Sequence, residues 1–329
     1  MGVEVKYDEM IVIDMHNDMP SKVLDEGYDP DIAHPAGDGH HTDIPRLIAS
    51  GLTATFFASW VDAKYAVQSP DGSFARAMAG LDVIRAFIAR HPDLLVFAET
   101  ADDVRAAKRA RKIAIFAAVE GGHAIENSLD KLTALRERGA RYLTLTWING
   151  NDWAGSSRGV DGTRTGGLTA FGREVIRAMN RLGMLVDVSH VSPETLADVL
   201  AVSDSPIIAS HSSARALNDH DRNLTDDQLR AVAASGGVIN VNFYPKFLDA
   251  RHPEPVPLSR VIDHIEHIAR VAGVDHVGLG SDFDGISAVP VGLEDVAAMP
   301  RIADALLDRG WSAAEIAQVM GLNMLRLLM

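Results

Sequence analysis

Apolar residues are distributed along the chain in a way that predicts strands alternating with helices. Eight short runs are nearly continuous in Val, Ile, Leu and other apolar residues, as expected for strands buried on both faces. They cover residues 10–14, 52–60, 113–120, 142–147, 184–190, 207–211, 238–243 and 276–282. Between most of them the apolar positions recur with helical spacing, at residues 75–90, 129–138, 171–182, 193–202, 226–234 and 258–271. Two more helices are predicted after the last strand, at residues 295–309 and 313–328.

Capping signals support two of these helices. Ser192 and Pro193 place a proline in the first helical turn, and Thr225 with Gln228 resembles a capping box. Eight strands that alternate with helices indicate the α/β class and a TIM-like (β/α)8 barrel of the metal-dependent hydrolase type, followed by C-terminal helices. A doubly wound open sheet is the alternative, but such a sheet usually has fewer strands. No change in composition marks a second domain, so we predict a single domain over residues 1–329.

Two long loops, at residues 20–44 and 147–167, are predicted after the first and fourth strands. Loops of this length within a compact domain are usually functional. Three histidines, His34, His40 and His41, lie in the first loop. Because that loop is rich in glycine, we interpret them as solvated or supporting histidines rather than metal ligands.

Composition excludes several classes of function. The chain has 31 basic and 45 acidic side chains and a net charge of −14, which argues against a nucleic-acid partner. The basic residues at 105–112 are interpreted as one solvated helix face. With no cysteine, disulfides and thiolate nucleophiles are impossible. The apolar runs are too short to span a membrane and the first residues do not resemble a signal peptide, so we expect a cytoplasmic protein without a membrane partner.

Polar residues at the ends of the predicted strands carry the candidate chemistry, because reactive side chains in such barrels lie at the carboxyl ends of strands. His16 and Asp18 are two residues apart, so on a strand both would face the barrel mouth. Glu120 follows seven apolar residues, where an unpartnered carboxylate would be costly to bury. His190 and His211 are 21 residues apart, about one βα unit, which predicts equivalent positions on adjacent strands.

Asp282 adds a carboxylate at the end of the eighth strand. Taken singly, these residues have structural interpretations, such as a helix N-cap or salt bridge for Glu120 or a core histidine for His190. Taken together, imidazole and carboxylate ligands without thiolate suit Zn²⁺, Mn²⁺ or Fe²⁺. Six such groups exceed what one catalytic zinc needs, so two metal ions bridged by Glu120 are the economical arrangement.

The chain resembles the membrane (renal) dipeptidases, zinc peptidases of the amidohydrolase superfamily. The matching motifs run in order along nearly the whole chain: DMHNDMP at 14–20, HTDIPRL at 41–47, VEGGHA at 119–124, RYLTLT at 141–146, DVSHVS at 187–192, SHSSA at 210–214, Arg222-Asn223, VNFY at 241–244 and GSDFDG at 280–285. The resemblance implies that one zinc is held by His16, Asp18 and Glu120. It implies that the other is held by Glu120, His190 and His211.

The same resemblance implies roles for two more residues. Asp282 would lie beside the metal pair, contact the substrate and shuttle a proton, and Arg222 would pair with the C-terminal carboxylate of the substrate through its bidentate fork. The alternative for Arg222 is a surface salt bridge with Asp219 or Asp221. Vertebrate members are disulfide-linked and lipid-anchored, whereas this cysteine-free chain resembles the soluble bacterial branch.

One position departs from the family pattern. Trp147 stands where the family usually has a histidine that is thought to donate a hydrogen bond to the substrate carbonyl. An indole N–H can donate but cannot titrate, and its bulk would reshape the substrate-binding pocket. Asn149 or Asn151, in the same loop, are candidates to replace the missing donor.

We hypothesise that the protein hydrolyses small dipeptides, including those with a D-residue at the C-terminal position. A hydroxide held by two zinc ions, or by other divalent transition metals, would attack the carbonyl, and Asp282 would carry the proton to the leaving amine. One alternative is an N-acyl-amino-acid or D-amino-acid amidase whose pocket is adapted by Trp147. Another is a repurposed relative without peptidase activity. Barrels of this type often dimerise, so a homodimer is also an expectation.

Overall fold

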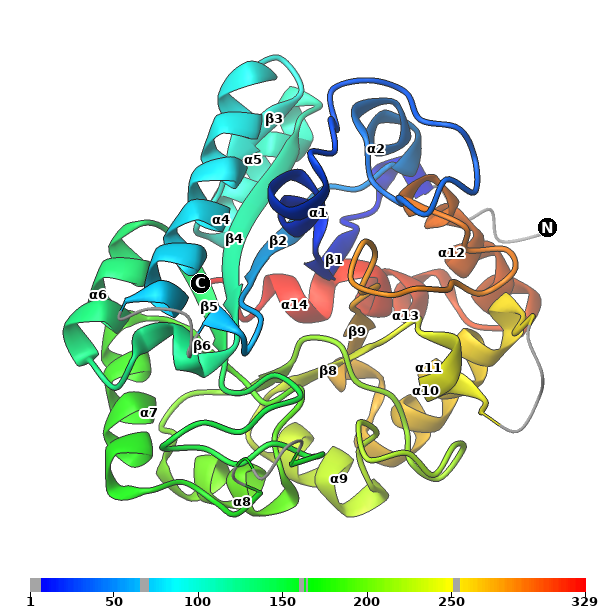
Figure 1. Ribbon diagram of the computed structural model, residues 1–329. Helices are drawn as coiled ribbons and strands as arrows, with labels where there is room; N and C mark the ends of the chain where they lie inside the picture. Colours follow the sequence, from blue (N-terminus) through cyan, green and yellow to red (C-terminus); the bar gives the residue numbers. More distant parts are fainter. Residues whose placement is uncertain (1–6, 66–70, 160–162, 164, 251–254) are drawn as a thin grey trace.

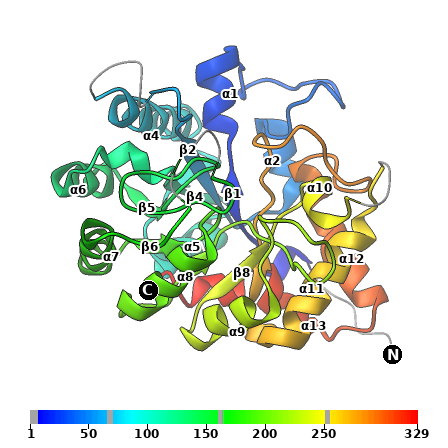
Figure 2. The same ribbon diagram turned by 60° about the horizontal axis from the view of Figure 1, so that its bottom comes forward.

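The computed structural model describes residues 7–65, 71–159, 163, 165–250 and 255–329. Within these residues, nine parallel strands form one sheet in the order β2-β1-β9-β8-β7-β6-β5-β4-β3, and the pairing of β2 with β4 closes eight of them into a barrel. Helices surround these strands on the outside (Figures 1 and 2). The (β/α)8 barrel predicted from the alternation of apolar runs is therefore confirmed.

The eight barrel strands correspond to the eight predicted runs. They are β1 (Ile13–Asn17), β2 (Ala54–Trp60), β4 (Ile113–Glu120), β5 (Ala140–Thr144), β6 (Leu185–Asp187), β7 (Ile208–Ala209), β8 (Val238–Val241) and β9 (Val277–Leu279). The ninth strand, β3 (Leu95–Phe97), was not predicted and pairs with the first residues of β4. Three residues are too few to show a periodicity, which explains why the sequence pattern missed it.

The bounds predicted for the first strand, residues 10–14, were wrong. Strand β1 begins at Ile13 and continues through polar residues to Asn17. These polar side chains are buried because they have partners: Asp14 accepts hydrogen bonds from the Ser281 amide at 2.8 Å and the Ser281 hydroxyl at 2.6 Å. The hydrophobic pattern could not reveal such pairing, since it joins residues at opposite ends of the chain.

Most predicted helices are present with similar bounds. They are α4 (Gly72–Arg90), α6 (Leu129–Glu137), α7 (Ala170–Leu182), α8 (Pro193–Val202), α9 (Asp226–Ala234) and α11 (Leu258–Ala272). Helix α5 (Ala101–Ala110) carries the basic cluster, and α10 (Pro245–Leu248) follows β8. The side chain of Ser192 caps α8, and Thr225 forms the predicted capping box of α9.

Three predicted segments differ from the structure. The loop predicted at 20–44 begins within α1 (Met19–Glu26) and ends at α2 (Ile44–Ser50). The helix predicted at 295–309 is divided into η5 (Val296–Ala298) and α12 (Pro300–Asp308), where proline starts a new helix. The helix predicted at 313–328 comprises α13 (Ala313–Ala317), the π-helical segment η6 (Gln318–Leu322) and α14 (Asn323–Leu325).

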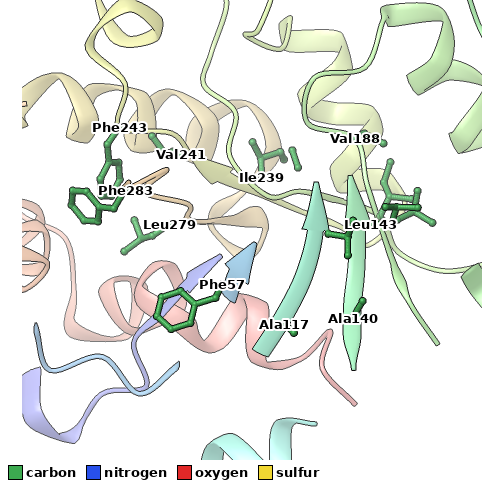
Figure 3. Packing of buried hydrophobic residues seen from close by; sticks show 14 of the residues in the cluster. Phe57, Ala117, Ala140, Leu143, Val188, Ile239, Val241, Phe243, Leu279 and Phe283 are labelled. Carbon is green, nitrogen blue, oxygen red and sulfur yellow. The ribbon is translucent and has the colours of Figure 1, made fainter. Parts of the chain in front are cut away.

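Buried apolar side chains form two clusters, one on each face of the strands. The outer cluster packs the strands against the helices; part of it, including the edge-to-face pair Phe243 and Phe283 at 5.8 Å, is shown in Figure 3. The inner cluster contains Phe56 and Phe116, stacked at 4.5 Å, and Tyr142. Tyr142 on β5 hydrogen-bonds to β1, which is not a neighbouring strand, so this contact crosses the barrel interior.

No helix among the described parts of the chain combines the length and apolar character needed to cross a membrane.

Candidate active site

Five of the predicted metal ligands converge at the carboxyl ends of the barrel strands. His16 Nε2 lies 3.2 Å from Asp18 Oδ2 and 3.5 Å from Glu120 Oε2. The other oxygen of Glu120, Oε1, lies 2.8 Å from His190 Nε2 and 3.6 Å from His211 Nε2. Glu120 therefore directs one oxygen toward His16 and the other toward His190 and His211, which is the arrangement that the predicted bridging role requires.

The atoms of this cluster are suited to cations. His190 Nε2 and His211 Nε2 face each other at 2.9 Å, and Asp18 Oδ1 is buried with no hydrogen-bond partner among the described residues. Ligand atoms of His16, Asp18 and Glu120 lie within 4.8 Å of one another, as do those of Glu120, His190 and His211. Burying carboxylates together costs free energy unless a positive charge compensates them. Carboxylate oxygens and imidazole nitrogens are ligands of divalent transition metals, so each of the two groups fits such an ion.

The prediction that His16 and Asp18 share one face of a strand was wrong, although the two side chains do meet. Strand β1 ends at Asn17, with an irregular register between Asp14 and Asn17, and Asp18 is the N-cap residue of α1. Because of this irregularity, successive side chains at the end of β1 no longer alternate regularly between the two faces of the sheet. The turn from β1 into α1 then brings Asp18 beside His16.

Tyr142 orients His16, a role that the sequence analysis missed. The Tyr142 hydroxyl donates to the carbonyl of Met15 at 3.1 Å, so its oxygen accepts the proton of His16 Nδ1 at 2.7 Å. Burial raises the pKa of Tyr142 far above its ordinary value, which keeps the hydroxyl protonated. With Nδ1 facing Tyr142, Nε2 is the ring nitrogen directed toward Asp18 and Glu120, the position from which it would ligate a metal ion. The available signal was a tyrosine within a buried strand, because its hydroxyl needs a partner.

A polar network orients His211 in the same way. Ser210 Oγ donates to Asp187 Oδ2 at 2.6 Å and therefore accepts from His211 Nδ1 at 2.7 Å. Asp187 also accepts from the Thr144 hydroxyl at 2.6 Å and from the backbone amides of Ser189 and Ser210 at 3.0 and 2.8 Å. Both oxygens of Asp187 are thus engaged, which fixes the serine that holds the His211 ring.

His190 occupies the position equivalent to His211, as predicted. Asp187 is in register with Ile208, so His190 and His211 each lie three residues beyond a matched pair. The left-handed backbone of His190, with φ of 70°, belongs to a conformation that non-glycine residues seldom adopt outside functional or strained sites. Burial and the nearby charge of Arg222 lower the pKa of His190 to about 4, so the ring is neutral at pH 7, as a metal ligand requires.

Asp282 lies beside this cluster, also with left-handed backbone (φ of 64°). Its Oδ2 accepts from Asn242 Nδ2 at 2.8 Å, and its amide donates to the carbonyl of His16 at 3.0 Å. Burial raises the pKa of Asp282 to about 7. A Cβ on Gly285 would lie 2.6 Å from Asp282 Oδ1 and 2.2 Å from Asp18 Oδ2, so only glycine permits both carboxylates to approach here.

Arg222 is buried close to the cluster. Its Nη2 donates to the carbonyl of His211 at 3.2 Å, and its Nε is buried without a partner in the described parts of the chain. Asp219 and Asp221 pair with Arg215 instead, at 2.6 and 3.6 Å, so the alternative interpretation of Arg222 as a surface salt bridge is not supported. Burial lowers the pKa of Arg222 to about 10, which leaves it charged at pH 7.

A cavity of about 430 Å³ opens over the metal-ligand cluster, and its wall includes Asp18, Glu120, His190 and Asp282. Trp147 also lines it, packed edge-on against Trp60 at 4.8 Å. Arg222 lines a smaller adjoining cavity of about 20 Å³ that shares His190 with the large one. The structure therefore places three of the predicted ligands, Asp282 and Trp147 in the wall of one cavity and Arg222 next to it.

The other residues considered from the sequence have structural contacts. Asn151 accepts from the amides of Trp153 and Ala154 and donates to the carbonyl of Leu145, so its amide group is engaged within the loop. Neither Asn149 nor Asn151 belongs to the described lining of the large cavity, which argues against either as the replacement donor.

The three histidines of the first loop also lie outside the metal-ligand groups found among the described residues. The rings of His34 and His40 pack on Tyr28 at 4.4 and 4.1 Å. His41 is buried, and its Nδ1 accepts from the amide of Asp284 at 2.8 Å. Their predicted role as supporting residues agrees with these contacts.

Comparisons with known proteins agree with this site. The family model for membrane dipeptidases, peptidase family M19, matches residues 4–329. The crystal structure of dipeptidase AC, a metallopeptidase of family M19, has 29% sequence identity and a TM-score of 0.84, covering 97% of this chain and 98% of that one. A metallopeptidase from Rhodobacter sphaeroides, liganded with a phosphinate mimic of the dipeptide L-Ala-D-Ala, has 28% identity and a TM-score of 0.84, covering 97% and 99%.

The probable dipeptidase PvdM from Pseudomonas aeruginosa shares the fold, with a TM-score of 0.87 at 24% identity over 98% of this chain and 95% of that one. The family match extends over nearly every residue, and the barrel and the cluster at its mouth are those of a metal-dependent enzyme. The chain belongs to the membrane dipeptidase family, peptidase family M19.

Proposed function

We propose that this protein is a dipeptidase that works with two zinc ions. The observation that carries the proposal is the position of Glu120, with one oxygen facing His16 Nε2 at 3.5 Å and the other facing His190 Nε2 at 2.8 Å. His16, Asp18 and Glu120 would hold one ion, and Glu120, His190 and His211 the other. Three imidazoles and two carboxylates suit Zn²⁺, and other divalent transition metals share this preference.

Bound ions would supply Lewis acidity toward the scissile carbonyl and would lower the pKa of water in the site. The chain itself supplies the proton carrier. Asp282 lines the cavity, and Asn242 holds its Oδ2 at 2.8 Å, which leaves Oδ1 to face the reacting groups. In this role Asp282 takes a proton from water and delivers it to the leaving amine.

Arg222 is proposed to bind the C-terminal carboxylate of the substrate. Three observations support this role. Arg222 is 3% exposed, its Nε has no partner within the described structure, and the small cavity that it lines shares His190 with the large one. A buried arginine without a carboxylate partner is expensive, and a carboxylate ligand would satisfy it through two parallel hydrogen bonds.

The substrate class follows from the cavity and from the relatives. A volume of about 430 Å³ is within the range of cavities that hold small molecules. The liganded relative from R. sphaeroides carries a mimic of a dipeptide with a C-terminal D-residue. We therefore include L,D-dipeptides among the proposed substrates.

The test is metal analysis of the purified protein together with hydrolysis of a library of L,L- and L,D-dipeptides. We expect about two equivalents of zinc and dipeptide hydrolysis that is lost with a chelator and restored by metal. A loaded enzyme that hydrolyses no dipeptide would overturn the proposal.

Trp147, which lines the cavity in place of the family histidine, favours one second candidate, an N-acyl-amino-acid or D-amino-acid amidase. Hydrolysis of N-acyl amino acids without hydrolysis of dipeptides would support that candidate. Two equivalents of metal with no amide hydrolysed at all would instead indicate a repurposed relative.

A further inference from the structure

Two aromatic pairs line the large cavity within the described structure. Trp60 and Trp147 meet edge-to-face, with ring centroids 4.8 Å apart and an interplanar angle of 71°. Tyr244 and Phe247 meet at 5.0 Å and 87°. We call these pairs the Trp60–Trp147 wall and the Tyr244–Phe247 wall.

The barrel places the two walls on opposite sides of the mouth. Trp60 is the last residue of β2, in register with Glu120 at the end of β4. Trp147 follows β5, which lies on the other side of β4 in the closed barrel. Tyr244 and Phe247 follow β8. In the closed ring of eight strands, β8 is four strands from β4 in either direction, so the two walls face each other across the metal-ligand cluster.

The position of Arg222 distinguishes the walls. Its guanidinium carbon lies 5.4 Å from the centre of the Phe247 ring, which puts the proposed anchor for the substrate carboxylate on the Tyr244–Phe247 side. A dipeptide anchored there directs its C-terminal residue toward Phe247. Its N-terminal residue then extends across the cluster toward the Trp60–Trp147 wall.

We propose that the Trp60–Trp147 wall selects dipeptides whose N-terminal residue has a large apolar side chain, aromatic or branched. This inference rests on the proposed dipeptidase function and on the proposed role of Arg222. An indole pair offers a broad apolar face, and its edge-to-face packing holds both rings in place before substrate binds. In an apolar pocket, one methylene group more or less changes kcat/KM by about tenfold or more.

Trp147 is the residue on which this selectivity depends. Trp60 is held by the end of a barrel strand, whereas Trp147 follows β5 and packs against the Trp60 ring at 4.8 Å. Replacing Trp147 by alanine removes one of the two indoles of the wall and leaves the strands and the metal-ligand residues in place.

The experiment measures kcat/KM of the zinc-loaded enzyme for two series of dipeptides, one varied at the N-terminal residue (Ala-Ala, Leu-Ala, Phe-Ala) and one varied at the C-terminal residue (Ala-Leu, Ala-Phe). We expect Phe-Ala and Leu-Ala to exceed Ala-Ala by about tenfold or more. In Trp147→Ala this ratio should fall toward one, whereas the ratios within the C-terminal series should stay as in the wild type.

Trp311→Ala is the matched control, because Trp311 lies outside the cavity lining and donates to Glu266 at 3.3 Å. It should retain the N-terminal preference. Trp147→Leu, a milder change, should show an intermediate ratio and guards against misfolding of the alanine variant.

The outcomes separate this inference from the proposed function. Hydrolysis of dipeptides with no preference for a large N-terminal residue overturns the inference alone. An N-terminal preference as large as that of the wild type in a folded Trp147→Ala or Trp147→Leu variant also overturns it, as does a shift of the preference to the C-terminal series. Failure to hydrolyse any dipeptide overturns both.

Discussion

Replacing Tyr142 by phenylalanine should weaken metal binding without disturbing the barrel core. The substitution deletes one hydroxyl and keeps the ring, which packs against Phe56 at 5.5 Å. Two hydrogen bonds disappear: the one donated to the carbonyl of Met15 at 3.1 Å and the one accepted from His16 Nδ1 at 2.7 Å. Since His16 and Met15 are both 0% exposed, water does not replace the lost oxygen.

The size of the effect follows from these two bonds. A buried polar group left without its partner costs about 1–3 kcal/mol. The free energy of unfolding of the metal-free protein should therefore fall by at least this amount. Loss of the group that orients a histidine ligand typically lowers metal affinity about 10–100-fold, which corresponds to roughly 1.4–2.7 kcal/mol.

Two measurements test this prediction. Denaturant unfolding of the metal-free protein gives the change in stability, and competition with a chromophoric chelator gives the change in zinc affinity. Tyr7→Phe is the control, because the Tyr7 hydroxyl donates to the carbonyl of Ser50 at 3.0 Å, and neither residue belongs to the metal-ligand groups. It should lose some stability and keep the zinc affinity of the wild type. If Tyr142→Phe binds zinc as tightly as Tyr7→Phe, the hydroxyl does not orient His16 and the reasoning fails.

Three further predictions concern Asp282, Gly285 and His264. Asp282→Asn should keep its zinc yet lose about 10²–10⁴ in kcat; retention of full activity would refute its role as proton carrier. Gly285→Ala should lose zinc affinity measured by the same competition, because its Cβ would lie 2.2 Å from Asp18 Oδ2; unchanged affinity would show that the loop moves aside freely. Burial lowers the pKa of His264 from 6.5 to about 4, so between these pH values the unfolded chain binds a proton that the folded protein does not. The free energy of unfolding should therefore decline by about 3 kcal/mol in total as the pH falls from 6.5 to 4. His264→Gln, compared by urea unfolding at pH 7 and pH 5, should show a smaller decline than the wild type, and an equal decline would assign the acid sensitivity to other groups.

The sequence alone was sufficient for the architecture because a barrel of parallel strands buries both faces of each strand. Strands that are buried on both faces are made of continuous apolar residues, which distinguishes them from the helices between them. Strand β4 (Ile113–Glu120), for example, matches its predicted run at both ends. Elements with weaker apolar patterns were misjudged. The polar end of β1, the three-residue β3 and the short helix α1 all depend on tertiary contacts for their stability.

The positions of the proposed metal ligands were also predictable, for a geometric reason. Parallel strands in a closed barrel end at one rim, so polar residues after each apolar run must gather there. The spacing of 21 residues between His190 and His211 equals the register offset between Asp187 on β6 and Ile208 on β7, which makes the two positions equivalent. Periodicity therefore identified the residues at the rim, although it gave the wrong account of how Asp18 reaches His16.

The determinants of ligand orientation and of the cavity walls came only from the tertiary structure. Tyr142 and His16 are 126 residues apart and meet across the barrel interior, and Gly285 touches Asp18 from the opposite end of the chain. No local pattern encodes such pairs, because they depend on where a strand changes its alternation and on the direction of each side chain. The sequence thus determined which groups stand at the barrel rim. Packing in three dimensions decided how the rings of His16 and His211 are oriented and where the aromatic side chains lie around the cavity.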